Sequence, residues 1–69
     1  MFWIEKVGAE RNDRFLSEID RFGWAIFGSW STARVFFTQA KAEQAARGCK
    51  GLSIKIMEST FEGDREVER

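Results

Sequence analysis

The clearest hydrophobic pattern of the chain lies between residues 38 and 58, where a helical period is followed by alternation. Small residues recur at spacings i, i+3, i+4 and i+7 and form one narrow face: Ala42, Ala45, Ala46 and Cys49. Thr38 can accept a hydrogen bond from the first helical turn, and Gly48 can end the helix in a left-handed conformation. The pattern predicts the principal helix over residues 39–48.

After this helix, apolar and polar residues alternate as they do in a strand with one face on the core. The apolar positions are Leu52, Ile54 and Ile56. We expect residues 52–58 to form a strand antiparallel to a neighbour. We also expect these side chains to share a core with Ala42, because a helix this short needs tertiary packing.

Two other segments have the composition of strands. Residues 2–7 (FWIEKV) alternate, with Phe2 and Ile4 on one side, and residues 33–37 (ARVFF) form a short apolar run. The polar residues 8–13 are typical of a hairpin connection. We therefore predict a first strand that turns back, and a later short strand that leads into the helix.

The segment 14–22 allows two interpretations. Its apolar residues lie at helical spacing, with Asp13 as an N-cap and Gly23 as a stop, which favours a short amphipathic helix. A strand is the alternative. Residues 22–30 (FGWAIFGSW) are dense in aromatic residues and interrupted by two glycines, which predicts a structured aromatic loop.

Length and composition favour one domain over residues 1–69, since no Pro-rich or Ser-rich linker divides the chain. Residues 59–69 lose the alternation and become charged, so we expect a frayed acidic tail. The elements together predict an α+β fold, in which a small antiparallel sheet of about three to four strands is packed by one principal α-helix.

Candidate chemistry is sparse. The chain has no His, no Tyr and a single Cys, so we expect no catalytic residues, no metal site and no cofactor. Cys49 has no partner for an internal disulfide and is expected to be a small buried apolar residue. No run of about 18 apolar residues and no leader pattern is present, so we expect no membrane association and a cytoplasmic location.

Charge is balanced overall but unevenly distributed. Residues 34–55 carry five basic residues and one acidic residue, whereas residues 56–69 carry five acidic residues and two basic ones. Such a distribution is also what solvated faces of a small domain produce. A zero net charge argues against nonspecific nucleic-acid binding.

Aromatic content gives the strongest hint of an interaction surface. Seven Phe and three Trp are more than one short Ala-faced helix can cover. They either build most of the core or remain partly exposed, as at interfaces. We expect at least one of Trp3, Trp24 and Trp30 to be exposed and to be covered by a partner or by a second copy.

Four segments together resemble small phage and prophage proteins: WIEKV, RFLSEIDRFGWAIFGSW, ARVFFTQAKAEQAA and LSIKIME. The similarity runs over about residues 2–58. Compact proteins of this kind include anti-CRISPR inhibitors of type I surveillance complexes. The resemblance implies a small antiparallel sheet packed by one helix and favours a strand for residues 14–19.

It also implies a phage-encoded inhibitor of a bacterial defence complex, acting in the cytoplasm of the host. If the first two strands and the chain end lie side by side, carboxylates and tryptophans would form one partner-binding surface that occupies a nucleic-acid-binding site. Its expected residues are Glu5, Glu18, Asp20, Trp24, Trp30, Glu58, Glu62 and Asp64. The alternative is a nucleic-acid-binding or regulatory module that uses the basic residues 34–55, and a homodimer is compatible with either function.

Overall fold

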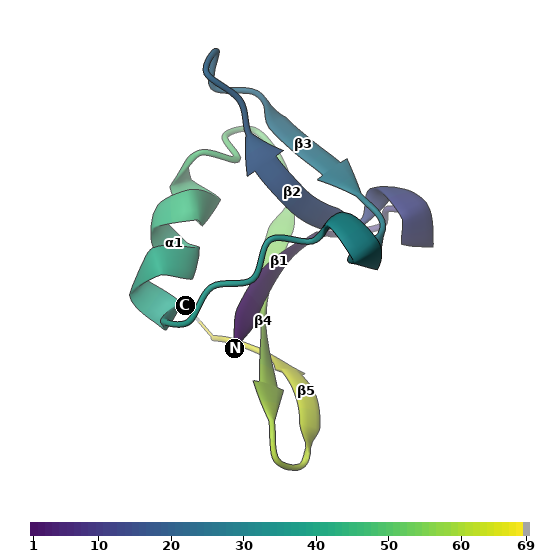
Figure 1. Cartoon of the computed structure of the whole chain (residues 1–69), viewed down its shortest axis with the longest axis vertical. Coiled ribbons are helices and arrows are strands. Elements are labelled where there is room, and N and C mark those ends of the chain that lie inside the picture. Colours follow the sequence, from purple (N-terminus) through teal and green to yellow (C-terminus); the bar gives the residue numbers. More distant parts are fainter. Residues whose placement is uncertain (69) are drawn as a thin grey trace.

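A five-stranded antiparallel sheet in the order β3-β2-β1-β4-β5 forms the framework of the structure, a computed structural model that describes residues 1–68 (Figure 1). Its strands are β1 Phe2–Lys6, β2 Phe15–Ile19, β3 Ala25–Gly28, β4 Ile54–Thr60 and β5 Gly63–Glu66. The helix α1, Gln39–Arg47, packs on one face, and two 3-10 helices, η1 Arg11–Asp13 and η2 Trp30–Thr32, lie in connections. The expected α+β class is confirmed, with five strands instead of three to four.

The segment 14–22 is a strand followed by a turn, and its helical spacing has a structural cause. The register of β2 against β3 shifts between Leu16 and Glu18, which leaves Ser17 as a β-bulge. Because of the extra residue, both Leu16 and Ile19 pack into the core, although residues three apart face opposite sides of a regular strand. The bulge therefore lets a strand bury residues three positions apart, which is the spacing typical of a helix.

Residues 22–30 are not only a loop, because β3 pairs with β2 from Phe15↔Gly28 to Ile19↔Ala25. The strand predicted at 33–37 is wrong, since this segment makes only the isolated bridge Phe2↔Phe36. Residues 33–37 form no regular strand because they enter the opening between β1 and β2. These two strands pair at Glu5↔Phe15 and then separate. The segment passes between them as a wedge.

Backbone hydrogen bonds fix this wedge to both strands. The Phe36 N–H donates to the Phe2 carbonyl (2.7 Å), and the Phe2 N–H donates to the Phe36 carbonyl (2.8 Å). On the other side, the Arg34 N–H donates to the Leu16 carbonyl (2.8 Å). The wedge thus satisfies polar backbone groups that the diverging strands would leave unpaired.

The predicted helix is confirmed, and it begins as expected. The Thr38 hydroxyl accepts a hydrogen bond from the Lys41 N–H (3.2 Å), and Ala42 and Ala46 are buried on its small-residue face. Gly48 is not left-handed (φ −79°); that conformation occurs at Gly51 (φ +77°). A Cβ atom on Gly48 would lie 2.5 Å from Ile19, so Gly48 allows close packing of the helix end against β2.

No helix within residues 1–68 is long and apolar enough to cross a membrane.

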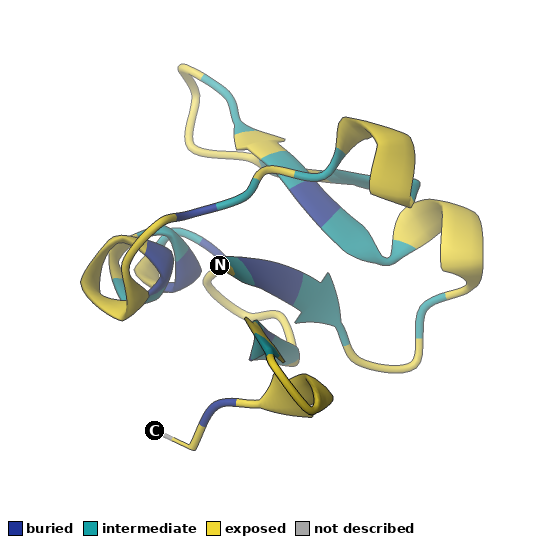
Figure 2. Ribbon diagram, turned by 60° about the horizontal axis from the view of Figure 1, so that its bottom comes forward, coloured by how far each residue is buried: buried dark blue, intermediate teal, exposed yellow. Residues whose placement is uncertain are grey.

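The core lies between α1 and the sheet. Ile4, Leu16 and Ile56 are fully buried, and Figure 2 shows buried residues on the strands, on the helix and in the connecting segments. Ile56 and Ala42 share this core as predicted, and Ile54 packs against it. The expected place of Leu52 is wrong: β4 begins only at Ile54, so Leu52 stays in the turn and is 38% exposed.

The expectation of a frayed tail from residue 59 is wrong for the residues that the structure describes; residue 69 lies outside them. β4 continues to Thr60, and β5 pairs with it from Met57↔Glu66 to Thr60↔Gly63. All four residues of β5 are exposed, which is why the sequence looks unstructured. The anchor is Val67, which is buried in the core and donates its N–H to the Ile56 carbonyl (2.8 Å).

Replacing Val67 with Asp tests this anchor. We expect Val67→Asp to lower the free energy of unfolding by at least about 2 kcal/mol, because it buries an unpaired charge. The matched control is Val7→Asp, at an exposed Val, which should change stability by less than about 0.5 kcal/mol. Urea unfolding followed by Trp fluorescence measures both, and equal stability of the two variants would contradict the anchor.

Candidate partner-binding surface

A small pocket lies on the sheet face opposite α1. Trp3 and Glu5 point to this face because they alternate with Ile4, which points into the core. The pocket has a volume of about 250 Å³, and we name it the Trp30 pocket after its most exposed ring. Its lining residues are Met1, Trp3, Glu5, Phe15, Trp30, Ser59 and Asp64.

Trp30 is held over the sheet by the 3-10 helix η2. The Thr32 hydroxyl donates to the Ser29 carbonyl (3.1 Å), and the Ala33 N–H donates to the Trp30 carbonyl (3.0 Å). This turn lies close to the end of β3, since a Cβ atom on Gly28 would be 2.8 Å from the Thr32 hydroxyl. Glycine at position 28 therefore permits the close approach that positions Trp30.

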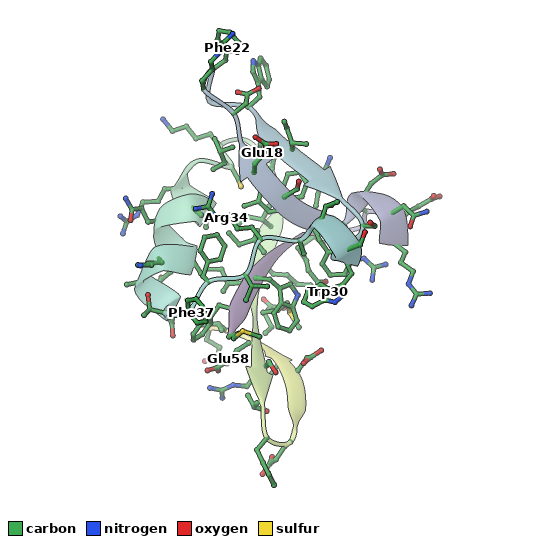
Figure 3. The ribbon with its side chains drawn as sticks, in the orientation of Figure 1. Glu18, Phe22, Trp30, Arg34, Phe37 and Glu58 are labelled. Atoms are coloured by element: carbon green, nitrogen blue, oxygen red, sulfur yellow. The ribbon has the colours of Figure 1, made fainter. Side chains whose placement is uncertain are left out.

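Three aromatic rings meet in the pocket edge to face. The Trp30 ring lies 5.1 Å from Trp3 (interplanar angle 72°) and 5.3 Å from Phe15 (70°), measured between centroids. Of these rings, Trp3 is buried, whereas Trp30 remains 52% exposed. The underlying rings thus fix the orientation of an exposed indole (Figure 3).

Two carboxylates accompany this indole. Glu5 accepts a hydrogen bond from the Trp3 indole N–H (2.9 Å), and its other oxygen lies 3.9 Å from the Lys55 ammonium. Asp64 lies in β5, opposite Ser59 of β4, and its carboxylate makes no hydrogen bond or ion pair with residues 1–68. The pocket therefore presents one oriented carboxylate and one unpaired carboxylate beside an aromatic face.

Three of the eight predicted site residues are thus brought together: Glu5, Trp30 and Asp64. Glu18 is exposed and lies opposite Ile26, which is also exposed, on the far side of the Ser17 bulge. From the pleat of β2 it lies on the same sheet face as Phe15, nearer the β2–β3 turn.

Asp20 has a structural role. Its carboxylate accepts hydrogen bonds from the Phe22 N–H (2.9 Å) and the Trp24 N–H (3.0 Å), and the Asp20 N–H donates to the Trp24 carbonyl (2.9 Å). These bonds close the β2–β3 turn, with Gly23 at φ +87°. Trp24 is 73% exposed at this turn, away from the Trp30 pocket.

The remaining two acids are separated from the pocket. Glu58 is paired with Phe2 in the sheet, so it lies on the α1 side, where Arg65 forms an ion pair with it (2.8 Å). Glu62 lies in the β4–β5 turn, at the opposite end of the long axis from Asp20 (Figure 1). The eight residues therefore do not form one continuous acidic surface, and the expectation of such a surface is wrong.

A second hollow, of about 630 Å³, lies on the α1 side between the β2–β3 turn and the end of the helix; we call it the hairpin cleft. Its lining includes Lys6 and Phe22, which sequence analysis did not select, as well as Lys50 of the basic residues 34–55 and Leu52, which was expected in the core. The signal that could have found it is the pair of aromatic residues, Phe22 and Trp24, on either side of a turn glycine. Cys49 forms part of its floor, and burial raises the pKa of the Cys49 thiol.

Two substitutions of Asp20 separate its charge from its hydrogen bonds. Asp20→Ala should lower the free energy of unfolding by about 1 kcal/mol, because two backbone N–H groups lose their acceptor. Asp20→Asn keeps an acceptor oxygen and should cost less than about 0.5 kcal/mol. The control is Asp13→Ala, at an exposed Asp in η1. If urea unfolding shows that Asp20→Asn lowers the free energy of unfolding as much as Asp20→Ala does, the structural role of Asp20 is contradicted.

The reactivity of Cys49 tests its burial. In the native protein a thiol reagent should react at least about tenfold more slowly than in the unfolded chain, because burial and the raised pKa both lower the accessible thiolate. The unfolded chain releases the thiol proton first, so stability should fall as pH rises above the ordinary thiol pKa. Cys49→Ala should lack this alkaline loss, and equal reaction rates in both states would refute the assignment.

Comparison with known proteins found no family model, no curated protein and no solved structure that matches this chain.

Proposed function

We propose that the chain is a phage-encoded inhibitor that binds a bacterial defence complex through the Trp30 pocket and covers a basic nucleic-acid-binding surface of that complex. The observation that carries this proposal is the exposed Trp30 ring held beside the carboxylates of Glu5 and Asp64. Type I surveillance complexes are the partner class to test first, because of the resemblance over residues 2–58.

The chemistry of the pocket suits an arginine or lysine side chain of the partner. A guanidinium group can stack on the face of an exposed indole, and carboxylates at the rim can accept its N–H groups. The attraction gains strength where the partner displaces water from the pocket. Surfaces that hold guide and target strands are rich in such basic side chains.

Glu18 and Ile26 extend the same sheet face beyond the pocket. Carboxylates at the periphery speed association with a basic surface, whereas a central aromatic anchor lengthens the lifetime of the complex. The mechanism we propose is therefore occlusion by a small acidic and aromatic patch, without the continuous acidic surface of a full DNA mimic. It requires binding alone, in the cytoplasm of the bacterial host.

The nucleic-acid-binding alternative receives less support from the placement of the basic residues. Lys55 is paired in the sheet with Glu5, on the face opposite α1. Arg34 lies over the Phe36 ring (5.5 Å to the centroid), and Phe36 belongs to the core beneath α1. The basic set is thus divided between two faces, which is unlike the single stripe that follows a nucleic-acid backbone.

Binding to a purified type I surveillance complex, measured by calorimetry, tests the proposal. Trp30→Ala and Asp64→Lys should each weaken binding at least about tenfold, because they remove the aromatic anchor and reverse a rim charge. The matched controls are Phe37→Ala, at an 82% exposed aromatic outside the pocket, and Glu10→Lys, at an exposed acid outside it. Circular dichroism confirms that each variant is folded.

Three results would refute the proposal. They are failure of the wild-type chain to bind any such complex, equal losses in the control variants, and tight salt-sensitive binding of duplex or single-stranded DNA by the chain alone. The last result would favour the nucleic-acid-binding alternative.

A further inference from the structure

Two exposed features at opposite ends of the molecule have no part in the Trp30 pocket. One is the tip of the β4–β5 hairpin, residues 61–62, and the other is the hairpin cleft. Figure 1 shows this tip and the β2–β3 turn, which forms one wall of the cleft, at opposite ends of the long axis. Figure 3 places Phe22, which lines the cleft, at the far end of the long axis from this tip.

The tip presents an aromatic ring on a well-defined turn. Thr60 and Gly63 pair across it, and the Thr60 hydroxyl donates a hydrogen bond to the Gly63 carbonyl. Phe61 lies between them and is fully exposed. Burying this apolar ring would be favourable in free energy, because it removes apolar surface from water. The adjacent Glu62 is also exposed, and its carboxylate has no partner within residues 1–68.

The cleft has the complementary character. Its walls are largely apolar, with exposed Phe22, Trp24 and Leu52 around the opening. Its two charged side chains are Lys6, which lies 5.6 Å from the Phe27 ring centroid, and Lys50. No carboxylate lines the cleft among the described residues. It therefore suits an aromatic side chain that is followed by an acid.

The chain cannot fill its own cleft with this tip. The molecule extends over 36 Å along its longest axis, and the tip lies at the opposite end of that axis from the β2–β3 turn that borders the cleft (Figure 1). A second copy in antiparallel orientation brings each tip toward the cleft of the other, so that one two-fold arrangement makes both contacts. Each contact combines aromatic burial with attraction between unlike charges.

The geometry points to a homodimer in which Phe61 of each copy enters the hairpin cleft of the other, with Glu62 facing Lys50. The interface is small, so the dimer belongs to the weak, reversible class, with a dissociation constant on the order of micromolar. A Phe61 ring in the cleft does not occupy the Trp30 pocket of the copy that receives it, because that pocket lies on the opposite face of the sheet. Dimerisation and partner binding are therefore separable.

Sedimentation equilibrium of the full chain tests the contact. The wild type should approach twice the 8.0 kDa mass of one chain as its concentration rises into the range of about 100 µM. Phe61→Ala, Glu62→Lys and Lys50→Glu should each weaken association at least about tenfold. The double variant Glu62→Lys/Lys50→Glu restores opposite charges and should dimerise again.

Glu10→Lys and Arg11→Glu, both on exposed residues outside the cleft and the tip, are the control substitutions and should leave the dimer intact. All substituted side chains are exposed, and circular dichroism confirms the fold. A wild type that stays monomeric, a Phe61→Ala variant with the dissociation constant of the wild type, or a double variant that associates no better than the single charge variants would each overturn the inference. Species that keep growing with concentration would overturn the two-fold arrangement. Binding of the surveillance complex by Phe61→Ala is measured separately, so this test does not depend on the proposed function.

Discussion

The structure depends on the backbone hydrogen bonds that the segment 33–37 makes with two diverging strands. β1 and β2 share only a short ladder near Glu5 and Phe15, which alone would leave the β2–β3 hairpin weakly attached to the rest of the sheet. The bonds at Arg34 and Phe36 bridge the opening between these strands, and the Phe36 ring fills the space beneath them. In a domain of 69 residues, this single crossing joins two halves into one core.

The same crossing determines what each face of the sheet presents. The residues immediately before it form η2 and place Trp30 over Trp3, on the face opposite the helix. The residues immediately after it form the Thr38 cap and start α1 on the other face. One short segment thus connects the candidate binding pocket to the packing of the core, so a shift of Phe36 would disturb both surfaces.

The sequence predicted the fold correctly wherever a single periodic pattern placed apolar residues on one face of a helix or strand. The helix with its Thr38 cap, the alternation of β1 and the position of Ile56 in the core were predictable for that reason. It was misleading where tertiary contacts decide: the Ser17 bulge imitates helical spacing, and β5 has no apolar side chain, yet it pairs with β4 and is followed by Val67, which is buried in the core. Glu5, Trp30 and Asp64 could be named in advance, but their convergence depends on strand order, which no local pattern encodes.

The bulge at Ser17 also bears on how the chain can change in length. A regular ladder has no spare residue, so a single insertion or deletion within it moves every following side chain to the other face. In β2 the extra residue is already present and lies between two correctly paired stretches, Phe15↔Gly28 with Leu16↔Phe27 and Glu18↔Ile26 with Ile19↔Ala25. The residues beyond Ser17 therefore have their own alternation of inward and outward side chains. The β2–β3 turn can diverge in sequence without altering the alternation in the strands before it.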